Sequence, residues 1–208
     1  TAKLAANLIA TAGANRVLTL DLHAAQLQGF FDIPVDHLTA ELVIARYLKS
    51  KQMENLTVVA PDVGNMKKAA RYAQKLGADL AIIHKRRLNG SEVACGEIIG
   101  DVKGRNIVMC DDMITTGGTI CGAAELLKQR GAGRIIAGAT HGVLTGLALE
   151  RLPKTPLDEV IVTDSVPVAH KKKILNNLTI LGVADLLGEA VRRIHLNLSI
   201  SNLFNGIQ

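Results

Sequence analysis

Short runs of apolar, β-branched residues alternate along the chain with segments whose apolar residues recur every three or four positions. The apolar runs predict strands over Arg16–Leu22, Leu56–Pro61, Leu80–His84, Asn106–Cys110, Arg134–Ala139, Glu159–Thr163 and Leu178–Gly182. The periodic segments predict helices over Ala2–Ala12, Ala40–Gln52, Lys67–Leu76, Thr119–Arg130, Leu144–Arg151 and Val183–Leu196. Strands rich in Val and Ile that are separated by helices are typical of βαβ units. We therefore predict an α/β fold built on a buried parallel sheet.

Polar and charged side chains follow several of the predicted strands. They are Asp21 and His23, Asp62, Lys85 to Arg87, Asp111 and Asp112, and Thr140 with His141. In open parallel sheets ligands bind at the carboxyl ends of the strands. Packing of a core does not explain such a grouping, so we expect a binding site at this edge of the sheet.

The most informative segment runs from Val108 to Thr119. An apolar strand ends in Asp111 and Asp112, passes through Thr-Thr-Gly-Gly-Thr, and enters a helix. Glycines let a backbone approach an anion, free amides at a helix start bind it, and carboxylates accept hydrogen bonds from hydroxyls. Each dipeptide alone is also typical of an ordinary turn, but the whole order predicts a sugar-phosphate site. The segment matches neither a Walker A loop nor a dinucleotide fingerprint.

A second candidate site is Asp21-Leu22-His23. On an extended segment these two side chains share one face, where a carboxylate and an imidazole could hold a divalent cation that carries substrate phosphates. A hydrogen-bonded pair at a strand end is the alternative interpretation.

Composition excludes several other classes of protein. The 208 residues are 48% hydrophobic and 21% charged, which is typical of a globular chain with a real core. No apolar run is long enough for a bilayer and no basic-then-apolar segment resembles a signal peptide, so we expect no membrane partner. Cys95, Cys110 and Cys121 are odd in number and widely spaced, which argues against a disulfide framework or a zinc site and favours the reducing cytoplasm.

The net charge of +5 raises the question of a nucleic-acid partner. Only two Tyr and three Phe residues occur, with no Trp, too few for a surface that stacks bases. Anionic small molecules explain the charge more simply, and we expect no nucleic acid.

One family resembles this chain over essentially its whole length. Asp21-Leu-His23 followed by Gln28-Gly-Phe-Phe-Asp32-Ile-Pro-Val-Asp36 is similar to the signature of the ribose-phosphate diphosphokinases, the phosphoribosyl pyrophosphate (PRPP) synthetases. The resemblance continues through Pro61 to Gly64, Lys85 to Arg87, Asp111 to Thr119, and Ser199 to Phe204. Family sequences begin with a further half-domain that carries an Arg-Gln-Asp-type ATP-binding segment. Because this chain opens at Thr1 inside a predicted helix, we expect further sequence upstream.

The resemblance implies a fold, a reaction and partners. The fold would be a parallel-sheet, phosphoribosyltransferase-like (type I) domain over residues 41–182, plus part of a second, similar domain. Residues 1–40 would be the remainder of the N-terminal, ATP-side domain, and residues 183–208 would return to it. The reaction would transfer diphosphate from ATP to the anomeric hydroxyl of ribose 5-phosphate, with Mg²⁺, giving PRPP and AMP for nucleotide biosynthesis. The protein would be a cytoplasmic homo-oligomer of dimers assembling into a hexamer.

The resemblance also implies roles for individual residues. Lys85 and Arg87 match a flexible catalytic loop. The ribose 5-phosphate site would comprise Arg87, Asp111, Asp112, Thr115, Thr116, Gly117, Gly118 and Thr119. Magnesium-linked positions would be His23 and Asp62, together with Asp21, Asp32 and Asp36.

Two positions depart from the family pattern. Thr115 stands where members commonly carry an acid, and Asn65 stands where they have a second glycine. Asparagine tolerates a positive φ better than most residues, so a turn at Asn65 can survive. Thr115 and the unmatched ATP segment leave open a catalytically silent regulatory subunit. A phosphoribosyltransferase that consumes PRPP is a further alternative, although such enzymes lack the Gln28 to Asp36 run. We expect the chain alone to be unstable or inactive.

Overall fold

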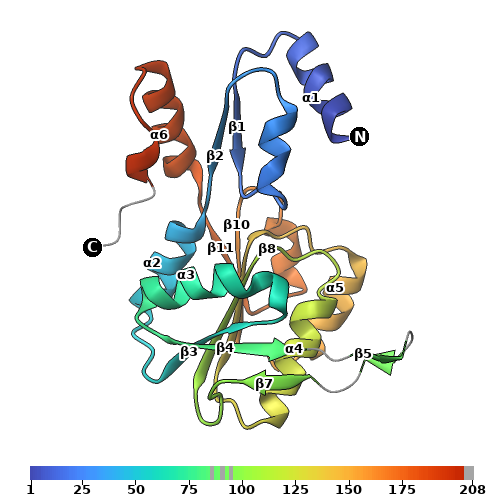
Figure 1. The fold of residues 1–208 in the computed structure, drawn as a ribbon. Coiled ribbons are helices and arrows are strands. Elements are labelled where there is room, and N and C mark those ends of the chain that lie inside the picture. The colour runs from blue at the N-terminus through green and yellow to red at the C-terminus, as the bar shows by residue number, and fades with distance from the viewer. Residues whose placement is uncertain (85–86, 90–91, 94–95, 204–208) are drawn as a thin grey trace. The chain divides into compact units, whose positions relative to one another are not determined.

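A computed structural model of the chain describes residues 1–84, 87–89, 92–93 and 96–203 (Figure 1). The chain forms two compact units, Thr1–Ala40 and Glu41–Gln208. The division falls where the predicted first domain ends. The predicted return of residues 183–208 to the first domain stays a prediction.

The first unit is small and contains one pair of strands. Its elements are α1 (Ala2–Thr11), β1 (Val17–Leu20), the 3₁₀ helix η1 (Ala25–Phe30) and β2 (Val35–Leu38). The two strands are parallel, with Val17 opposite Val35. β2 was not predicted, because its Asp and His residues interrupt the apolar pattern.

The second unit contains a seven-stranded sheet in the order β11-β10-β9-β8-β3-β4-β7. Its strands are β3 (Leu56–Ala60), β4 (Asp79–His84), β7 (Glu97–Ile99), β8 (Asn106–Met113), β9 (Ile135–His141), β10 (Glu159–Thr163) and β11 (Leu178–Leu181). All neighbouring strands are parallel except β4 and β7. This confirms the predicted α/β fold with a mostly parallel sheet, and adds a short antiparallel edge strand.

Helices precede, separate and follow the strands of this sheet along the chain. They are α2 (Glu41–Ser50), α3 (Met66–Leu76), α4 (Gly118–Gln129), α5 (Gly146–Arg151) and α6 (Ala184–His195), with 3₁₀ helices η2 (Val63–Asn65), η3 (Leu152–Lys154), η4 (Ala169–Lys173) and η5 (Ser201–Leu203). β5 (Arg87–Asn89) and β6 (Glu92–Val93) form a separate antiparallel pair. Within the described ranges, no helix is both long and apolar enough to cross a membrane.

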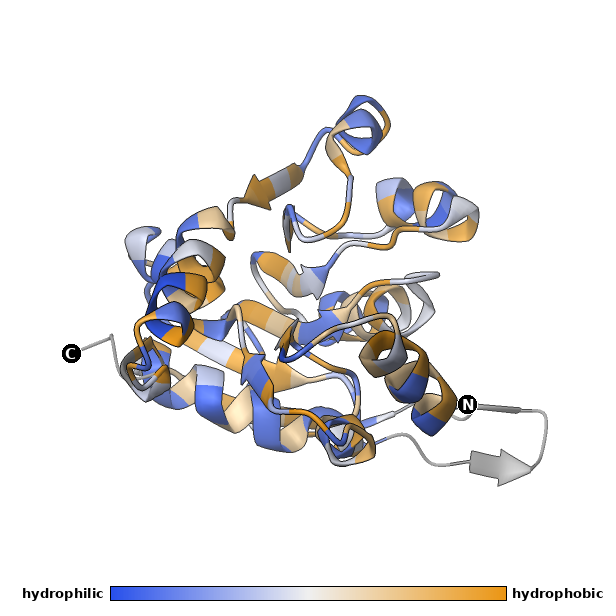
Figure 2. Ribbon diagram, turned by 90° about the horizontal axis from the view of Figure 1, so that it is seen from above, coloured by the Kyte–Doolittle hydropathy of each residue, from blue (hydrophilic) through white to orange (hydrophobic). Residues whose placement is uncertain are grey.

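The sheet is buried on both faces because its strand residues alternate between two cores. Ile107 and Met109 of β8 belong to a cluster that includes Leu127 of α4. Val108 and Cys110, the intervening residues, belong to a second cluster with residues of α2 and α3. In Figure 2 the strands are coloured mainly hydrophobic, whereas the helices carry both hydrophobic and hydrophilic positions. Double burial explains why the strands read as continuous apolar runs.

Two predicted strand ends differ from the structure in ways that matter for function. β1 ends at Leu20, and Asp21 has a φ of 41°. Asp21 and His23 therefore do not lie on one face of an extended strand, and the prediction that they do is wrong. β8 continues to Met113, so Asp111 and Asp112 lie on the last residues of the strand and not in the following loop.

Candidate functional site

The site begins where β3 and β8 end, side by side at the carboxyl edge of the sheet. These strands pair in parallel, with Val58 opposite Val108. Asp62 follows β3 after Pro61, and Asp111 and Asp112 lie near the end of β8, so the three carboxylates lie on or just after neighbouring strands. The predicted clustering of acids at this edge is therefore present.

Lys68, from the first turn of α3, lies between the two acids of β8. Its Nζ is 3.4 Å from an oxygen of Asp111 and 3.2 Å from one of Asp112. Asp111 also accepts a hydrogen bond of 2.8 Å from the amide of Asp112. One ammonium group thus offsets the mutual repulsion of two adjacent carboxylates.

The environment raises the pKa of Asp111 to about 6. Burial is the largest cause, since it disfavours the charged form, and a hydrogen bond with the Asp112 side chain adds to it. The positive charge of Lys68 acts in the opposite direction. Asp111 is therefore mainly ionised above pH 7, although less completely than an exposed carboxyl.

Asn65 links the acids of the two strands. Its amide donates to Oδ1 of Asp62 at 3.1 Å, and its side-chain Nδ2 donates to Oδ2 of Asp111 at 3.2 Å. Its φ is −85°, so the turn requires no left-handed residue here. The departure from the family glycine therefore costs no backbone strain and adds a contact to Asp111.

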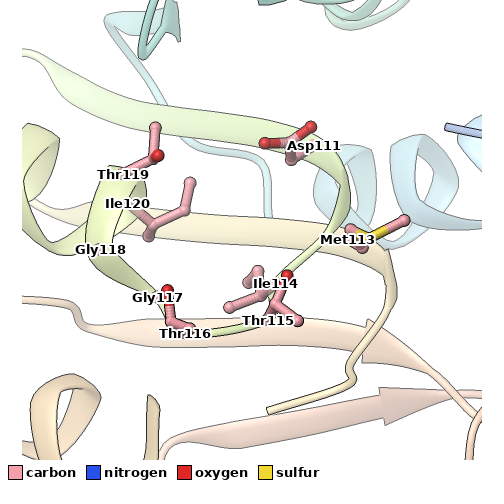
Figure 3. A pocket seen from close by; sticks show the side chains of 9 residues that line it. All are labelled: Asp111, Met113, Ile114, Thr115, Thr116, Gly117, Gly118, Thr119 and Ile120. Carbon is pink, nitrogen blue, oxygen red and sulfur yellow. The ribbon is translucent and has the colours of Figure 1, made fainter. Parts of the chain in front are cut away.

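A small open pocket of about 90 Å³ lies beside this acidic cluster. Figure 3 shows the chain curving around it, from Asp111 at the end of β8 to Thr119 at the start of α4. The lining residues are Asp111, Met113, Ile114, Thr115, Thr116, Gly117, Gly118, Thr119 and Ile120. Asp111 and the predicted phosphate loop, residues 115–119, therefore share one pocket, and Asp112 pairs with Lys68 next to it.

Gly117 allows the chain to turn from this loop into α4. It precedes the first helical residue and has a φ of 74°, a conformation that favours glycine. The first amides of α4 have no carbonyl partner within the helix, and the positive end of its dipole lies here. The turn thus presents hydrogen-bond donors to an anion.

Three of the predicted magnesium ligands of the first unit, Asp21, Asp32 and Asp36, interact with other groups of that unit. Asp32 forms an ion pair with Lys3 at 2.5 Å, and Asp36 forms one with Arg16 at 2.5 Å. Asp21 accepts a hydrogen bond from the amide of Ala40, and His23 follows in the loop after β1. Among the described residues, no three His, Cys, Asp or Glu side chains are grouped closely enough to share a metal ion.

The predicted catalytic loop falls largely outside the described residues. Lys85 is not described, and Arg87 is described only as the first backbone position of β5. Two other basic or imidazole groups, His141 and Lys171, are placed near the phosphate loop, residues 115–119. Nδ1 of His141 lies 2.9 Å from Oγ of Ser165. Lys171 is half-buried and donates to the carbonyl of Val143.

Sequence reasoning missed Lys68 and the contact of Asn65 with Asp111. A signal was present in principle, because Asn65 in η2 and Lys68 in the first turn of α3 both follow β3, the strand next to β8. A parallel sheet brings that turn to the same edge as Asp111.

Comparison with known proteins finds similarity to one family over most of the chain. Residues 87–205 match the family described as the phosphoribosyl synthetase-associated domain. The chain is 53% identical over 207 residues to a ribose-phosphate pyrophosphokinase of Rhodopirellula baltica, covering 98% of this chain and 65% of that protein. It is 50% identical over 206 residues to one of Helicobacter hepaticus, with the same coverage. The chain thus spans about two thirds of the length of these relatives.

A solved structure extends the similarity to the fold. The phosphoribosylpyrophosphate synthetase of Mycobacterium smegmatis superimposes with a TM-score of 0.85 at 42% sequence identity. The match covers 94% of this chain and 64% of that one.

Proposed function

The chain belongs to the phosphoribosyl synthetase family, and we propose that it acts as a ribose-phosphate diphosphokinase, which transfers diphosphate from ATP to the anomeric hydroxyl of ribose 5-phosphate. The products would be PRPP and AMP. One observation carries the proposal: Asp111, one of two adjacent carboxylates, shares a pocket with a phosphate-type loop at the carboxyl edge of the sheet.

The pocket suits the two ends of a sugar phosphate. The 5-phosphate would bind at the amides and hydroxyls of residues 115–119, where the helix dipole favours an anion. Asp111 and Asp112 would accept hydrogen bonds from ribose hydroxyls, which fixes the ring and orients the anomeric hydroxyl. Thr115 would contribute a hydroxyl to this pocket in place of the acid common in the family.

Lys68 would keep both acids in the form that the sugar requires. An ionised carboxylate only accepts hydrogen bonds, whereas a protonated one offers fewer acceptor sites. Because Lys68 lies within 3.4 Å of both acids, it favours their charged forms together. We assign it a positioning role, since it acts through Asp111 and Asp112.

The donor set at this edge fits Mg²⁺. That ion takes a few protein oxygens and completes its shell with water and substrate phosphate. Asp62 lies beside Asp111 through Asn65 and would supply one such carboxylate oxygen. When bound, Mg²⁺ would neutralise charge on the phosphates of ATP. Asp21, His23, Asp32 and Asp36 stay predicted ligands, and the ion pairs of Asp32 and Asp36 oppose that role.

Lys85 and Arg87 stay the predicted catalytic pair. Phosphoryl transfer depends on positioning and on charge neutralisation, so a lysine and an arginine that close over the diphosphate would stabilise the transition state. Assembly into dimers and a hexamer also stays a prediction. A cytoplasmic location is supported by Cys110 and Cys121, which are free thiols.

Two measurements test the proposal. Calorimetry on the 208-residue chain should detect binding of ribose 5-phosphate. A coupled assay should detect AMP when ATP, Mg²⁺ and ribose 5-phosphate are all present and the chain is joined to the family's ATP-binding segment, whereas the 208-residue chain alone should release none. Absence of both signals in a folded sample would contradict the proposed function. Binding without AMP release in the joined chain would favour the silent regulatory subunit.

A further inference from the structure

The phosphate loop is held from outside by the segment that follows β9. We call residues 142–151 the strap. The amide of Leu144 donates to the carbonyl of Ile114 at 2.9 Å. The amide and the hydroxyl of Thr145 both donate to the carbonyl of Thr115, at 2.9 Å and 3.1 Å. Nη1 of Arg151 donates to the carbonyl of Thr116 at 3.3 Å.

Every carbonyl from Ile114 to Gly117 therefore has a hydrogen-bond donor. The strap supplies donors for the first three, and the amide of Cys121 in α4 supplies the donor for Gly117 at 2.9 Å. A carbonyl engaged in this way cannot rotate into the pocket, where its negative oxygen would repel a phosphate dianion. The amides of the loop and of the first turn of α4 are thereby left to bind the anion.

The strap is itself anchored, which allows it to act as a rigid support. Leu144 adopts a φ of 42°, unusual for a branched residue, while the residue is only 1% exposed. Lys171 donates to the carbonyl of Val143, and the hydroxyl of Thr155 donates to the carbonyl of Arg151 at 2.9 Å. Burial and these bonds maintain a backbone conformation that is strained by itself.

Arg151 can act in a second way. Its Nη1 would lie 3.4 Å from a Cβ added at Gly118, so the guanidinium is close to the start of α4. Arginine carries five N–H donors and a permanent charge, and the bond to Thr116 uses one of these donors. Its charge therefore favours an anion at this end of the pocket.

We propose that Thr145 and Arg151 are positioning residues for recognition of the 5-phosphate, and that they act by fixing the loop carbonyls away from the bound anion. The inference rests on the proposed function for the identity of the ligand, ribose 5-phosphate. It adds that affinity for the phosphate group depends on residues outside the binding loop.

The first test removes one hydroxyl. We expect Thr145→Val to weaken binding of ribose 5-phosphate and of inorganic phosphate by about fivefold, the effect of one hydrogen bond. Thr145→Ser, which keeps the hydroxyl, should bind within about twofold of the original chain. The matched control is Thr57→Val, which removes a hydroxyl-to-carbonyl bond of 3.3 Å to Asp101 near the amino end of β3. Its phosphate affinity should not change.

The second test removes the guanidinium. Arg151→Met should weaken the binding of ribose 5-phosphate and of inorganic phosphate by about tenfold, because it removes a hydrogen bond and a charge. Lys154→Met removes a nearby charge from η3 that makes no bond to the loop, and it should change affinity by less than about twofold. Thermal unfolding of each variant separates loss of fold from loss of binding.

The outcomes distinguish the two proposals. If the original chain binds neither ribose 5-phosphate nor phosphate, the proposed function fails and the inference fails with it. If the original chain binds and folded Thr145→Val and Arg151→Met bind as tightly as their controls, the inference alone is overturned. The inference is supported if both variants lose affinity for ribose 5-phosphate and for inorganic phosphate while their controls keep it, and if Thr145→Ser retains the affinity that Thr145→Val loses.

Discussion

Asp111 is the residue on which the site depends most strongly. Its carboxyl group is half-buried, which raises its pKa to about 6, yet the proposed binding of the sugar would require its charged form. Asn65, Lys68 and the amide of Asp112 all donate to it and hold it in place. The charged form of Asp111 is less favourable in the folded chain than in the unfolded chain, because its pKa is higher when folded. The contribution of Asp111 to the free energy of unfolding therefore declines as pH rises from about 4 to about 6.

Replacement of Lys68 tests this interpretation. Lys68 lowers the pKa of Asp111, so Lys68→Met should raise that pKa further above 6. The variant should then bind ribose 5-phosphate more weakly at pH 7 and recover affinity only at higher pH. Calorimetric titrations from pH 5.5 to pH 9 measure the shift.

The control is Lys67→Met, since Lys67 is exposed and precedes Lys68 directly. The phosphate of the ligand titrates identically with both variants, so any difference between them reports on the protein. An unchanged pH profile in Lys68→Met would contradict the assigned role.

At the residue scale, the sequence predicted what one segment contains but not what contacts it. Asp111, Asp112 and residues 115–119 are contiguous, and their chemistry is legible without a structure. Lys68 and Asn65 are more than 40 residues away, as the separations of 44 and 46 positions show. Their contacts depend on how α3 crosses the sheet, which tertiary packing decides.

At the scale of elements, the turn from β8 into α4 would control how closely the backbone approaches the proposed ligand. Gly117, with a φ of 74°, is the residue that this turn requires. Gly117→Ala should lower the free energy of unfolding by about 1 kcal/mol or more, since alanine is strained in this region. It should also weaken phosphate binding, because the loop amides shift. Chemical denaturation and calorimetry measure the two effects.

Gly122→Ala is the matched control within the same helix. It lies in the helical body of α4, and an added Cβ there would have nothing within 4 Å. Alanine is the better helix former by about 1 kcal/mol, so this variant should be more stable and bind normally. Equal effects of the two substitutions would refute the special role of the turn.

Most long elements were predictable because the sheet is buried on both faces. Continuous apolar runs identify such strands directly, and the predicted Glu159–Thr163 agrees with β10. The misses are short and polar. β2 and β7 contain charged residues, and pairing with a neighbouring strand defines them more than their own composition does.

At the scale of the whole molecule, the candidate site lies at the carboxyl ends of the strands, whereas a buried ionic cluster around Glu159 lies at their amino ends. Glu159 begins β10, at the amino end, and its side chain is only 8% exposed. It contacts Lys51 at 2.7 Å and accepts hydrogen bonds from Tyr47 and Thr179. Burial opposes its ionisation, but these donors together lower its pKa below the usual 4.5.

Glu159→Gln should therefore destabilise the chain without weakening the site. A depressed folded pKa contributes stability above the unfolded pKa and loses it as pH falls. We expect a loss of about 2 kcal/mol at pH 7, from the buried ionic hydrogen bonds. The difference should shrink below pH 4, while affinity for ribose 5-phosphate at pH 7 should be unchanged. Reduced affinity in the folded variant would contradict this separation.

The grouping of the predicted metal ligands was the feature least open to prediction at this scale. Asp21, His23, Asp32 and Asp36 belong to the first unit and Asp62 to the second, so local sequence cannot state whether they meet. The ion pairs of Asp32 with Lys3 and Asp36 with Arg16 depend on side chains from α1 and from the residue before β1. Spacing alone did not indicate them.

The central claim is that the pocket between Asp111 and Thr119 binds ribose 5-phosphate by both ends. Amide chemical-shift mapping of the 22.1 kDa chain tests it most directly, with ribose 5-phosphate and inorganic phosphate titrated separately. Both ligands should shift the amides of residues 115–119, whereas only the sugar phosphate should also shift those of Asp111 and Asp112. Shifts that lie elsewhere, or a sugar phosphate that leaves the acids undisturbed, would contradict the account.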